Sequence, residues 1–296
     1  MSHPIEVGVL GGSGLYALDA LETVEERYLQ TPFGTPSDAY ITGILEGRGV
    51  AFLPRHGRGH RLTPSEVNYR ANIYGFKLLG VTQLVAVTAV GSLREAIHPG
   101  EIVLPDQLID RTRQRESSFF GHGVVAHIPF ADPFCPRLGE SLSAAATKAA
   151  AAGEGVSTVH RGGTLVCIEG PAFSTRAEAH LFRRWGWDLV GMTPLQEAKL
   201  AREAEICYAA MAMVTDYDCW HTAAEAVTAD AVAATMAANI ETAKRVLVRL
   251  IPALADPPAC GCGQALSGAL MSTAASIPAE AKKRLEPLIG KYLSRD

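Results

Sequence analysis

Short apolar segments alternate with helix-length amphipathic segments along most of the chain, and this alternation limits the fold more than any other feature. Several of the apolar segments are rich in Val, Ile and Leu, as strands buried on both faces are. Such an order predicts an α/β layer fold. The expected strands are Glu6–Leu10, Gly49–Leu53, Gln83–Thr88, Glu101–Leu104, Gly163–Ile168, Asp188–Gly191 and Cys207–Val214. The expected helices are Asn68–Leu79, Arg137–Ala152, Thr175–Trp185, Leu195–Glu203 and Ala229–Leu254.

One segment predicts antiparallel pairing within this sheet. Ile41–Leu53 holds two apolar runs separated by Glu46-Gly-Arg-Gly49, which is typical of a hairpin. We therefore expect a mixed central sheet flanked by helices. The Pro- and Gly-rich stretch from Ala255 to Gly263 ends the last long helical pattern. It divides the chain into one domain over residues 1–255 and a C-terminal extension over 256–296, which ends in a short helix.

Composition excludes several classes of protein. The chain has 296 residues, 48% of them hydrophobic, which is enough for a large core. Its net charge of -4 argues against binding to duplex nucleic acid, which favours a basic excess. No run of 18 uncharged apolar residues appears, and the apolar stretch Ile5–Leu10 is too short for a signal peptide. We expect a soluble, cytoplasmic protein with neither membrane nor nucleic-acid partners.

The six cysteines are scattered along the chain, which does not resemble a disulfide framework. Only Cys260 and Cys262 lie close in sequence. A redox or metal role would fit this pair, but no second cysteine or histidine pair lies near it in the sequence. A plain tail loop is the favoured interpretation, and no metal is expected.

A glycine-rich loop follows the first expected strand. Gly12, Gly14 and Ala17 fit the dinucleotide fingerprint G-x-G-x-x-A. That fingerprint requires a helix and then a second parallel strand, whereas this chain enters a turn-rich segment, Thr31–Ser37. A nicotinamide-dependent dehydrogenase is thus a weak alternative. The loop can also offer backbone N–H groups and the Ser13 hydroxyl to a single phosphate.

A basic loop, Arg55–Arg61, follows the strand Gly49–Leu53, and five of its seven residues are Arg or His. His56 and His60 have the i, i+4 spacing of a helical metal site, but two glycines oppose a helix and three arginines repel a cation. Arginine forks match phosphate oxygens. Phosphate is therefore the expected ligand, with a solvated basic loop as the alternative.

Two further strands end in polar residues. Thr88 ends the strand Gln83–Thr88 and Ser92 lies in the small-residue loop after it; both could donate hydrogen bonds to an anion or a sugar, although such turns are usually structural. Asp216 and Asp218 follow the last strand and lie two residues apart, so that both can point to one side. Open α/β sheets bind ligands at this end of their strands. A helix cap or a solvated loop is the alternative.

In this order, the motifs resemble those of the methylthioadenosine phosphorylase branch of the purine nucleoside phosphorylase family, from Gly8 to about Leu250. The matching stretches are GVLGGSGL at 8–15, LPRHGRGH at 53–60, VNYRANI at 67–73, TAVGSLREAIHPGEIV at 88–103, HIPFADPFCP at 127–136, CIEGPAFSTRAE at 167–178 and MVTDYDCW at 213–220. The resemblance implies a nucleoside phosphorylase domain over residues 1–255 that cleaves adenine nucleosides with phosphate.

The resemblance also implies roles for single residues. Phosphate would be held by Ser13, Arg55, His56, Thr88, Ala89 and Thr193. Met192 would face the ribose, Phe173 and Ser174 would lie beside the base, and Asp216 and Asp218 would read it. His127 would reach the 5' pocket of a neighbouring subunit, which implies a homotrimer or a dimer of trimers. No cofactor is implied, since phosphate is a co-substrate.

The two aspartates connect this resemblance to the chemistry. Glycosidic cleavage builds negative charge on the leaving purine, and a carboxyl group of raised pKa can protonate its N7. Neighbouring carboxylates favour that state because two like charges oppose double ionisation. A protonated Asp216 can donate to N7 while an ionised Asp218 accepts from the adenine N6 amine. A 6-oxopurine lacks that amine, and its family branch usually has Asn at the first position.

Two departures and three alternatives accompany this interpretation. Ala172 stands where family members often have Arg, and Pro194-Leu-Gln-Glu197 replaces the usual Pro-Glu after Met-Thr. The alternatives are a phosphorylase of 6-oxopurine nucleosides, the dehydrogenase, and a nucleoside-binding protein without activity.

Overall fold

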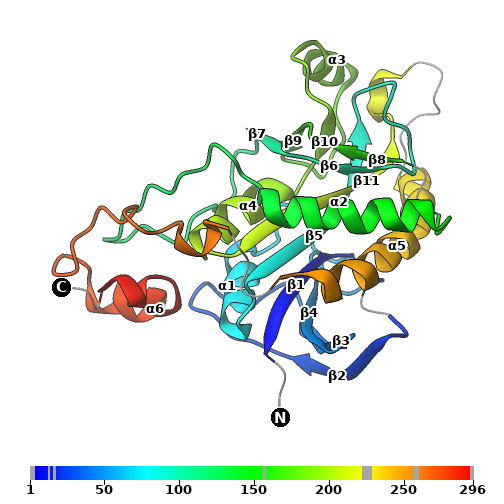
Figure 1. The fold of residues 1–296 in the computed structure, drawn as a ribbon. Coiled ribbons are helices and arrows are strands. Elements are labelled where there is room, and N and C mark those ends of the chain that lie inside the picture. Colours follow the sequence, from blue (N-terminus) through cyan, green and yellow to red (C-terminus); the bar gives the residue numbers. More distant parts are fainter. Residues whose placement is uncertain are drawn as a thin grey trace.

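The computed structural model describes residues 4–12, 14–15, 18–155, 158–221, 229–255 and 260–293. Within these residues, eleven strands form one mixed sheet with helices on both faces (Figure 1). The strands are β1 (Ile5–Gly11), β2 (Leu21–Arg27), β3 (Tyr40–Leu45), β4 (Arg48–Pro54), β5 (Gln83–Ser92), β6 (Ile102–Leu104), β7 (Gln107–Arg111), β8 (Val159–Arg161), β9 (Thr164–Ile168), β10 (Leu189–Gly191) and β11 (Cys207–Asp216). The α-helices are α1 (Tyr69–Leu79), α2 (Pro136–Ala151), α3 (Arg176–Arg184), α4 (Pro194–Glu203), α5 (Ala229–Leu250) and α6 (Ala279–Leu293).

The sheet confirms the predicted mixed topology. Its main path runs β2-β3-β4-β1-β5-β10-β9-β7, and β11 joins β5 to β6 and, through β6, to β8. β4, β1, β5 and β11 are parallel neighbours, whereas β3 and β4 form the expected hairpin. Glu46 and Gly47 both have positive φ at its tip, as a tight hairpin turn requires. The four parallel strands therefore end at one edge of the sheet.

Alternating side chains of the central strands build two separate cores. Val7, Val9 and Met211 pack with the helices α2 and α5, while Leu84 and Ala210 pack with α1 and α4 on the other face. This two-residue alternation explains why the strands are apolar throughout. The result is a helix–sheet–helix arrangement with α2 and α5 side by side over the sheet (Figure 1).

Local signals fix several helix ends. Asn68 caps α1 by accepting a hydrogen bond from the backbone of Ala71, and Gly80 ends the helix in the left-handed conformation. Thr175 and Glu178 form a capping box at the start of α3. These ends agree with the sequence prediction to within one residue.

The C-terminal segment packs against α1. Leu285, Leu288 and Ile289 of α6 share a core with Ile73 of α1, and the Tyr74 hydroxyl donates to the carbonyl of Arg284. The rest of the segment runs beside the loop between β7 and α2, so that both form an arm that extends to the left in Figure 1. The division of the chain at residue 255 stays a prediction.

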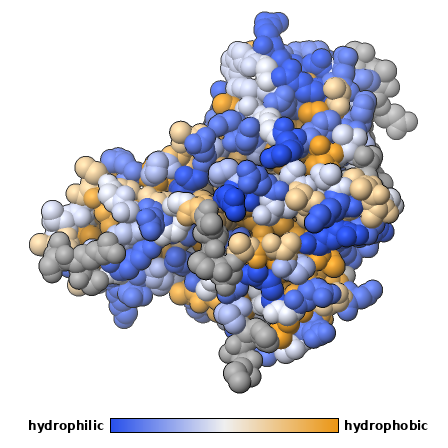
Figure 2. Space-filling view, in the orientation of Figure 1, coloured by the Kyte–Doolittle hydropathy of each residue, from blue (hydrophilic) through white to orange (hydrophobic). Residues whose placement is uncertain are grey.

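The molecular surface seen in the orientation of Figure 1 carries both hydrophilic and hydrophobic side chains. Hydrophilic side chains predominate around α3 at the top of the view, and hydrophobic ones are interspersed through the middle of the molecule (Figure 2). Among the described residues, no helix is both long and apolar enough to cross a membrane.

Candidate active site

A cavity of about 690 Å³ opens where the parallel strands end. A volume of this size is typical of small-molecule sites, and so is its position at the carboxyl ends of the strands. The fold brings together ten of the twelve predicted site residues along its wall. They are Arg55, His56, Thr88, Ala89, Phe173, Ser174, Met192, Thr193, Asp216 and Asp218.

The glycine-rich loop contributes its flanking residues. Gly12 and Gly14 line the cavity, while the predicted phosphate ligand Ser13 lies outside the described residues. Among the described residues, the next strand, β2, is an edge strand that pairs only with β3, and the parallel neighbours of β1 are β4 and β5. The nine residues between β1 and β2 cannot supply a crossover helix. β1 and β2 therefore do not have the parallel arrangement that a dinucleotide-binding unit requires.

Arg55 is buried and largely committed to protein partners. Its Nη2 donates to Glu197 Oε2 at 3.2 Å, and its Nε donates to the other carboxylate oxygen. Nη1 donates to the carbonyl of Val87 at 3.0 Å and Nη2 to that of Leu10 at 3.3 Å. Because a guanidinium carries five N–H donors, one Nη1 donor remains for a ligand in the cavity.

His56 is uncharged at neutral pH. Burial, assisted by the positive charge of Arg55, lowers the pKa of His56 to about 4. Its Nδ1 lies 2.8 Å from the carbonyl oxygen of Leu62, so that this nitrogen carries the proton and donates. Nε2 is then the ring nitrogen that can accept a hydrogen bond from a ligand. The ring also stacks on that of His60, with 4.4 Å between the ring centroids.

The start of helix α4 faces the same cavity. Thr193 is its N-cap residue, its side chain makes no capping bond, and Pro194 occupies the first turn, where proline is favoured. The N-terminus of a helix carries partial positive charge, which attracts anions. Thr88 and Ala89 approach from β5. By contrast, the Ser92 hydroxyl donates to the carbonyl of Arg94 and is used within the fold.

The two aspartates lie close together, but not by strand alternation as the sequence suggested. Asp216 ends β11, whereas Asp218 starts a 3-10 turn with a φ of 51°. The backbone N–H of Asp218 donates to Asp216 Oδ1 at 2.7 Å, and the Thr215 hydroxyl lies 2.7 Å from Oδ2. A Cβ on Gly91 would lie 3.0 Å from Asp216 Oδ1. Glycine thus leaves room for this carboxyl beside the sheet.

Both carboxyl groups favour the protonated state more than ordinary aspartates do. Burial raises the pKa of Asp216, while hydrogen bonds from Thr215 and Asp218 partly oppose the rise. Burial also raises the pKa of Asp218, and the negative charge of Asp216 adds to the effect. This end of the cavity can therefore hold a proton.

Two buried polar atoms in the cavity wall make no hydrogen bond of good geometry to a described residue, although the Ser174 hydroxyl is close enough to Asp218 to lower the pKa of its carboxyl group. They are Ser174 Oγ and Asp218 Oδ2. Leaving a buried polar atom unsatisfied costs about 1–3 kcal/mol, so a ligand with matching polar groups would be favoured here. Phe173, which is 45% exposed, offers an aromatic face beside them. The chemistry of this end suits a flat, polar heterocycle.

The sequence did not identify two residues that position the site. Glu197 is buried and accepts from Arg55 and from the Tyr208 hydroxyl at 2.8 Å. Arg115 donates to the backbone carbonyl of Met192 and to Gln196 at 3.2 Å. The unusual Pro194-Leu-Gln-Glu197 stretch was the available signal for Glu197. No motif marks Arg115, because its partners are distant in sequence.

Of the predicted site residues that the structure describes, His127 alone lies away from this cavity. It is exposed on the arm, where its backbone N–H donates to the carbonyl of Ala269 at 2.9 Å. Val125 and Met271 nearby are 47% and 64% exposed. Exposed apolar side chains of this size are compatible with contact to another protein surface.

Known proteins share this chain's sequence and fold. The sequence model of the Phosphorylase superfamily matches residues 6–252. S-methyl-5'-thioadenosine phosphorylase of Geobacter sulfurreducens is 54% identical over 97% of this chain and 99% of its own length. The enzyme of the same name from Chloroflexus aurantiacus is also 54% identical, over 99% of this chain and its full length.

Solved structures agree with these sequence matches. A methylthioadenosine phosphorylase from an antarctic soil metagenomic library superposes with a TM-score of 0.91 at 46% identity, covering 97% of this chain and 99% of that one. The methylthioadenosine phosphorylase of Schistosoma mansoni in complex with adenine gives a TM-score of 0.83 at 36% identity, covering 90% and 99%. By sequence and by fold, this chain belongs to the phosphorylase superfamily.

Proposed function

We propose that this enzyme, a pentosyltransferase, cleaves S-methyl-5'-thioadenosine with inorganic phosphate into adenine and 5-methylthioribose 1-phosphate. The observation that carries the proposal is one cavity whose wall holds both hydrogen-bond donors, at Arg55 and the start of α4, and the carboxyl groups of Asp216 and Asp218. The names of the relatives support the same reaction. The donors suit phosphate, and the carboxyl groups suit the leaving purine, which needs a proton.

Phosphate is the nucleophile in this proposal. Arg55 offers its remaining N–H, His56 accepts from a phosphate O–H, and Thr88, Thr193 and the backbone near Ala89 complete the cradle. Ser13 is proposed as a further ligand. A phosphate oxygen attacks the anomeric carbon as the bond to N9 breaks, and its negative charge stabilises the positive charge on the sugar. The reaction uses phosphate as a co-substrate and no cofactor.

Asp216 acts as the general acid. The electron pair of the broken bond moves into the purine, and a proton from Asp216 neutralises it at N7. The raised pKa of the Asp216 carboxyl supports this role. Asp218 accepts from the N6 amine, which would give its Oδ2 a donor of good geometry. Together the two carboxyl groups bind N7 and the N6 amine of adenine, and a 6-oxopurine has no amine at that position.

The remaining contacts hold the nucleoside in place. Phe173 stacks near the base and Ser174 donates or accepts at its edge. Met192 lies against the ribose, and Arg115 holds the Met192 backbone in position. We assign Arg115 as a positioning residue, since its guanidinium is directed at protein carbonyls and side chains.

We further propose that His127 completes the 5' pocket of a neighbouring subunit. Its place on the arm, outside its own cavity, and the exposed Val125 and Met271 support this arrangement. A homotrimer, or a dimer of trimers, would let each arm reach the next site.

A substrate panel tests the proposed specificity. With phosphate present, methylthioadenosine and adenosine should release free base, and inosine should react roughly 10- to 100-fold more slowly in kcat/KM. This factor follows from the cost of an unsatisfied group at Asp218, about 1–3 kcal/mol. A preference for inosine would instead indicate a 6-oxopurine phosphorylase. Tight binding of adenosine without base release would indicate a binding protein.

A further inference from the structure

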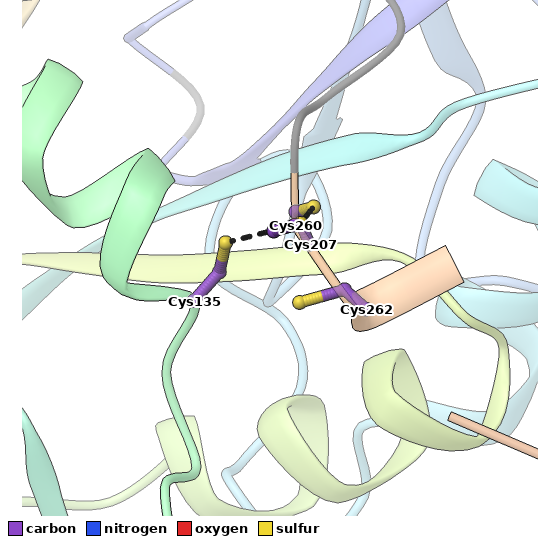
Figure 3. Close-up of side chains that lie close together, drawn as sticks. All are labelled: Cys135, Cys207, Cys260 and Cys262. Carbon is purple, nitrogen blue, oxygen red and sulfur yellow. Dashed lines mark hydrogen bonds between the residues drawn. The ribbon is translucent and has the colours of Figure 1, made fainter. Parts of the chain in front are cut away.

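Four of the six cysteines converge at one point of the fold (Figure 3). Cys135 precedes α2, Cys207 starts β11, and Cys260 and Cys262 lie in the C-terminal segment. The backbone N–H of Cys135 donates to the carbonyl of Tyr208 at 2.7 Å, which holds the start of α2 beside the start of β11. In the sequence, no second cysteine pair lies near Cys260 and Cys262. The fold places Cys135 and Cys207 beside them.

The sulfur atoms have the spacing of ligands around a single ion. All four Sγ atoms lie within 4.8 Å of one another. Cys260 Sγ is 3.2 Å from Cys207 Sγ and 3.7 Å from Cys135 Sγ. A disulfide requires about 2.05 Å. With zinc–sulfur bonds of about 2.3 Å, the edge of a tetrahedron of sulfur atoms is about 3.8 Å, which lies within the observed range from 3.2 Å to the upper limit of 4.8 Å.

The surroundings favour a structural site. Cys135 and Cys207 are almost fully buried against the core that contains Leu138 and Leu142, and Cys262 is 9% exposed. Cys135 stands at the N-terminus of α2, where the helix dipole stabilises a thiolate. A cavity of about 900 Å³, bordered by Cys135, Cys260 and Cys262, gives an ion access from solvent. Four protein ligands would leave no open coordination position.

We propose that Cys135, Cys207, Cys260 and Cys262 bind one zinc ion that fastens the C-terminal segment to the central sheet. Soft thiolate ligands in a tetrahedral arrangement select zinc over harder divalent ions. Binding converts four thiols to thiolates and releases their protons. This replaces the expectation, drawn from the sequence, that the chain holds no metal.

Other contacts show what the ion would secure. Lys291 of α6 donates to the carbonyl of Gly263 at 3.0 Å, and Gln83 of β5 donates to that of Ala255 at 3.0 Å. The zinc would lie between these two attachments. Cys207 and Asp216 stand at opposite ends of β11, about 30 Å apart at a rise of about 3.3 Å per residue. The ion therefore takes no part in the proposed phosphorolysis.

Metal analysis of the full-length protein tests the site directly. Purified without chelator, or reduced and then given zinc, the chain should hold one zinc per chain after desalting. Cobalt in its place should give the intense absorption of a tetrahedral thiolate complex. Cys207→Ser and Cys262→Ser should each abolish stoichiometric binding, whereas Cys167→Ser, at a buried cysteine outside the cluster, should retain it. The cobalt spectrum of the unmodified chain keeps the test valid if a variant fails to fold.

Thiol titration separates the proposal from its competitors. Denatured in chelator without reductant, a zinc-bound chain exposes all six thiols, whereas two disulfides within the cluster would leave two. Fewer than six thiols, or six thiols in a chain that retains no zinc, would overturn the proposal. Removal of the zinc should lower the melting temperature and speed proteolysis of the C-terminal segment, while kcat of the folded enzyme stays within about twofold. A loss of kcat without a loss of stability would contradict a structural role.

Discussion

Asp216→Asn is expected to lower kcat for methylthioadenosine by roughly 10²–10⁴, the usual contribution of a general acid. Asn can still donate a hydrogen bond to N7 but cannot transfer a proton, so KM should change much less than kcat. The measurement is the steady-state rate of adenine release at saturating phosphate. Asp110→Asn, at an exposed carboxyl paired with Lys199 outside the cavity, is the matched control and should keep its rate.

The pH dependence gives a second readout. Because the pKa of Asp216 is raised, part of the enzyme holds the reactive proton above the usual range of aspartate, and kcat should fall as the pH rises through that pKa. This limb should disappear in Asp216→Asn. The same amide can donate to a 6-oxo group, so the preference should shift toward inosine, more so when Asp218→Leu removes the opposing carboxylate.

A merely structural role for the pair gives a different pattern. If both aspartates only stabilise the turn after β11, each variant should lose melting temperature and lose all substrates in proportion. A folded Asp216→Asn enzyme with unchanged kcat on methylthioadenosine would remove the assigned role.

Arg55→Ala is expected to raise the KM for phosphate roughly 10- to 100-fold, because a hydrogen bond from a charged donor contributes about 1.5–3 kcal/mol. The KM for the nucleoside, a neutral ligand at the other end of the cavity, should change little. The variant should also be destabilised by about 3–5 kcal/mol, since Glu197 would remain buried without its partner. Initial rates at varied phosphate and a denaturant titration measure the two effects.

A double variant distinguishes binding from folding. Arg55→Met with Glu197→Gln removes both charges, so that stability should recover toward that of the unmodified enzyme. Its phosphate KM should remain high if Arg55 contacts phosphate. Recovery of both properties together would show that Arg55 acts only through the structure.

The apolar strands of the sheet could be predicted from the sequence, whereas a polar strand could not. β5 and β11 are buried along nearly their whole length, and their Val, Ala and Met residues identify them. β2, with the sequence LETVEER, exposes every residue after Leu21, so it lacks the alternation that marks a half-buried strand. It forms at the sheet edge through pairing with β3. Its pairing therefore depends on tertiary context.

The prediction of the candidate site from sequence was limited in the same way, by contacts that depend on tertiary context. Local motifs at strand ends predicted Arg55, Thr88 and Asp216, because the carboxyl ends of parallel strands meet at one edge. The roles of Glu197 and of the four cysteines depend on contacts between segments that are distant in sequence. Arg55 and Glu197, for example, are 142 residues apart. Sequence spacing carries no signal for such pairs.

The dependence of base release on phosphate tests the central claim most directly. Methylthioadenosine and the enzyme, freed of phosphate by dialysis, should give no adenine beyond the background rate. Addition of phosphate should start adenine release with one equivalent of 5-methylthioribose 1-phosphate, visible as a sugar phosphate by phosphorus NMR. Adenine release at the same rate in phosphate-free buffer, with free methylthioribose as the product, would show a hydrolase and contradict the account.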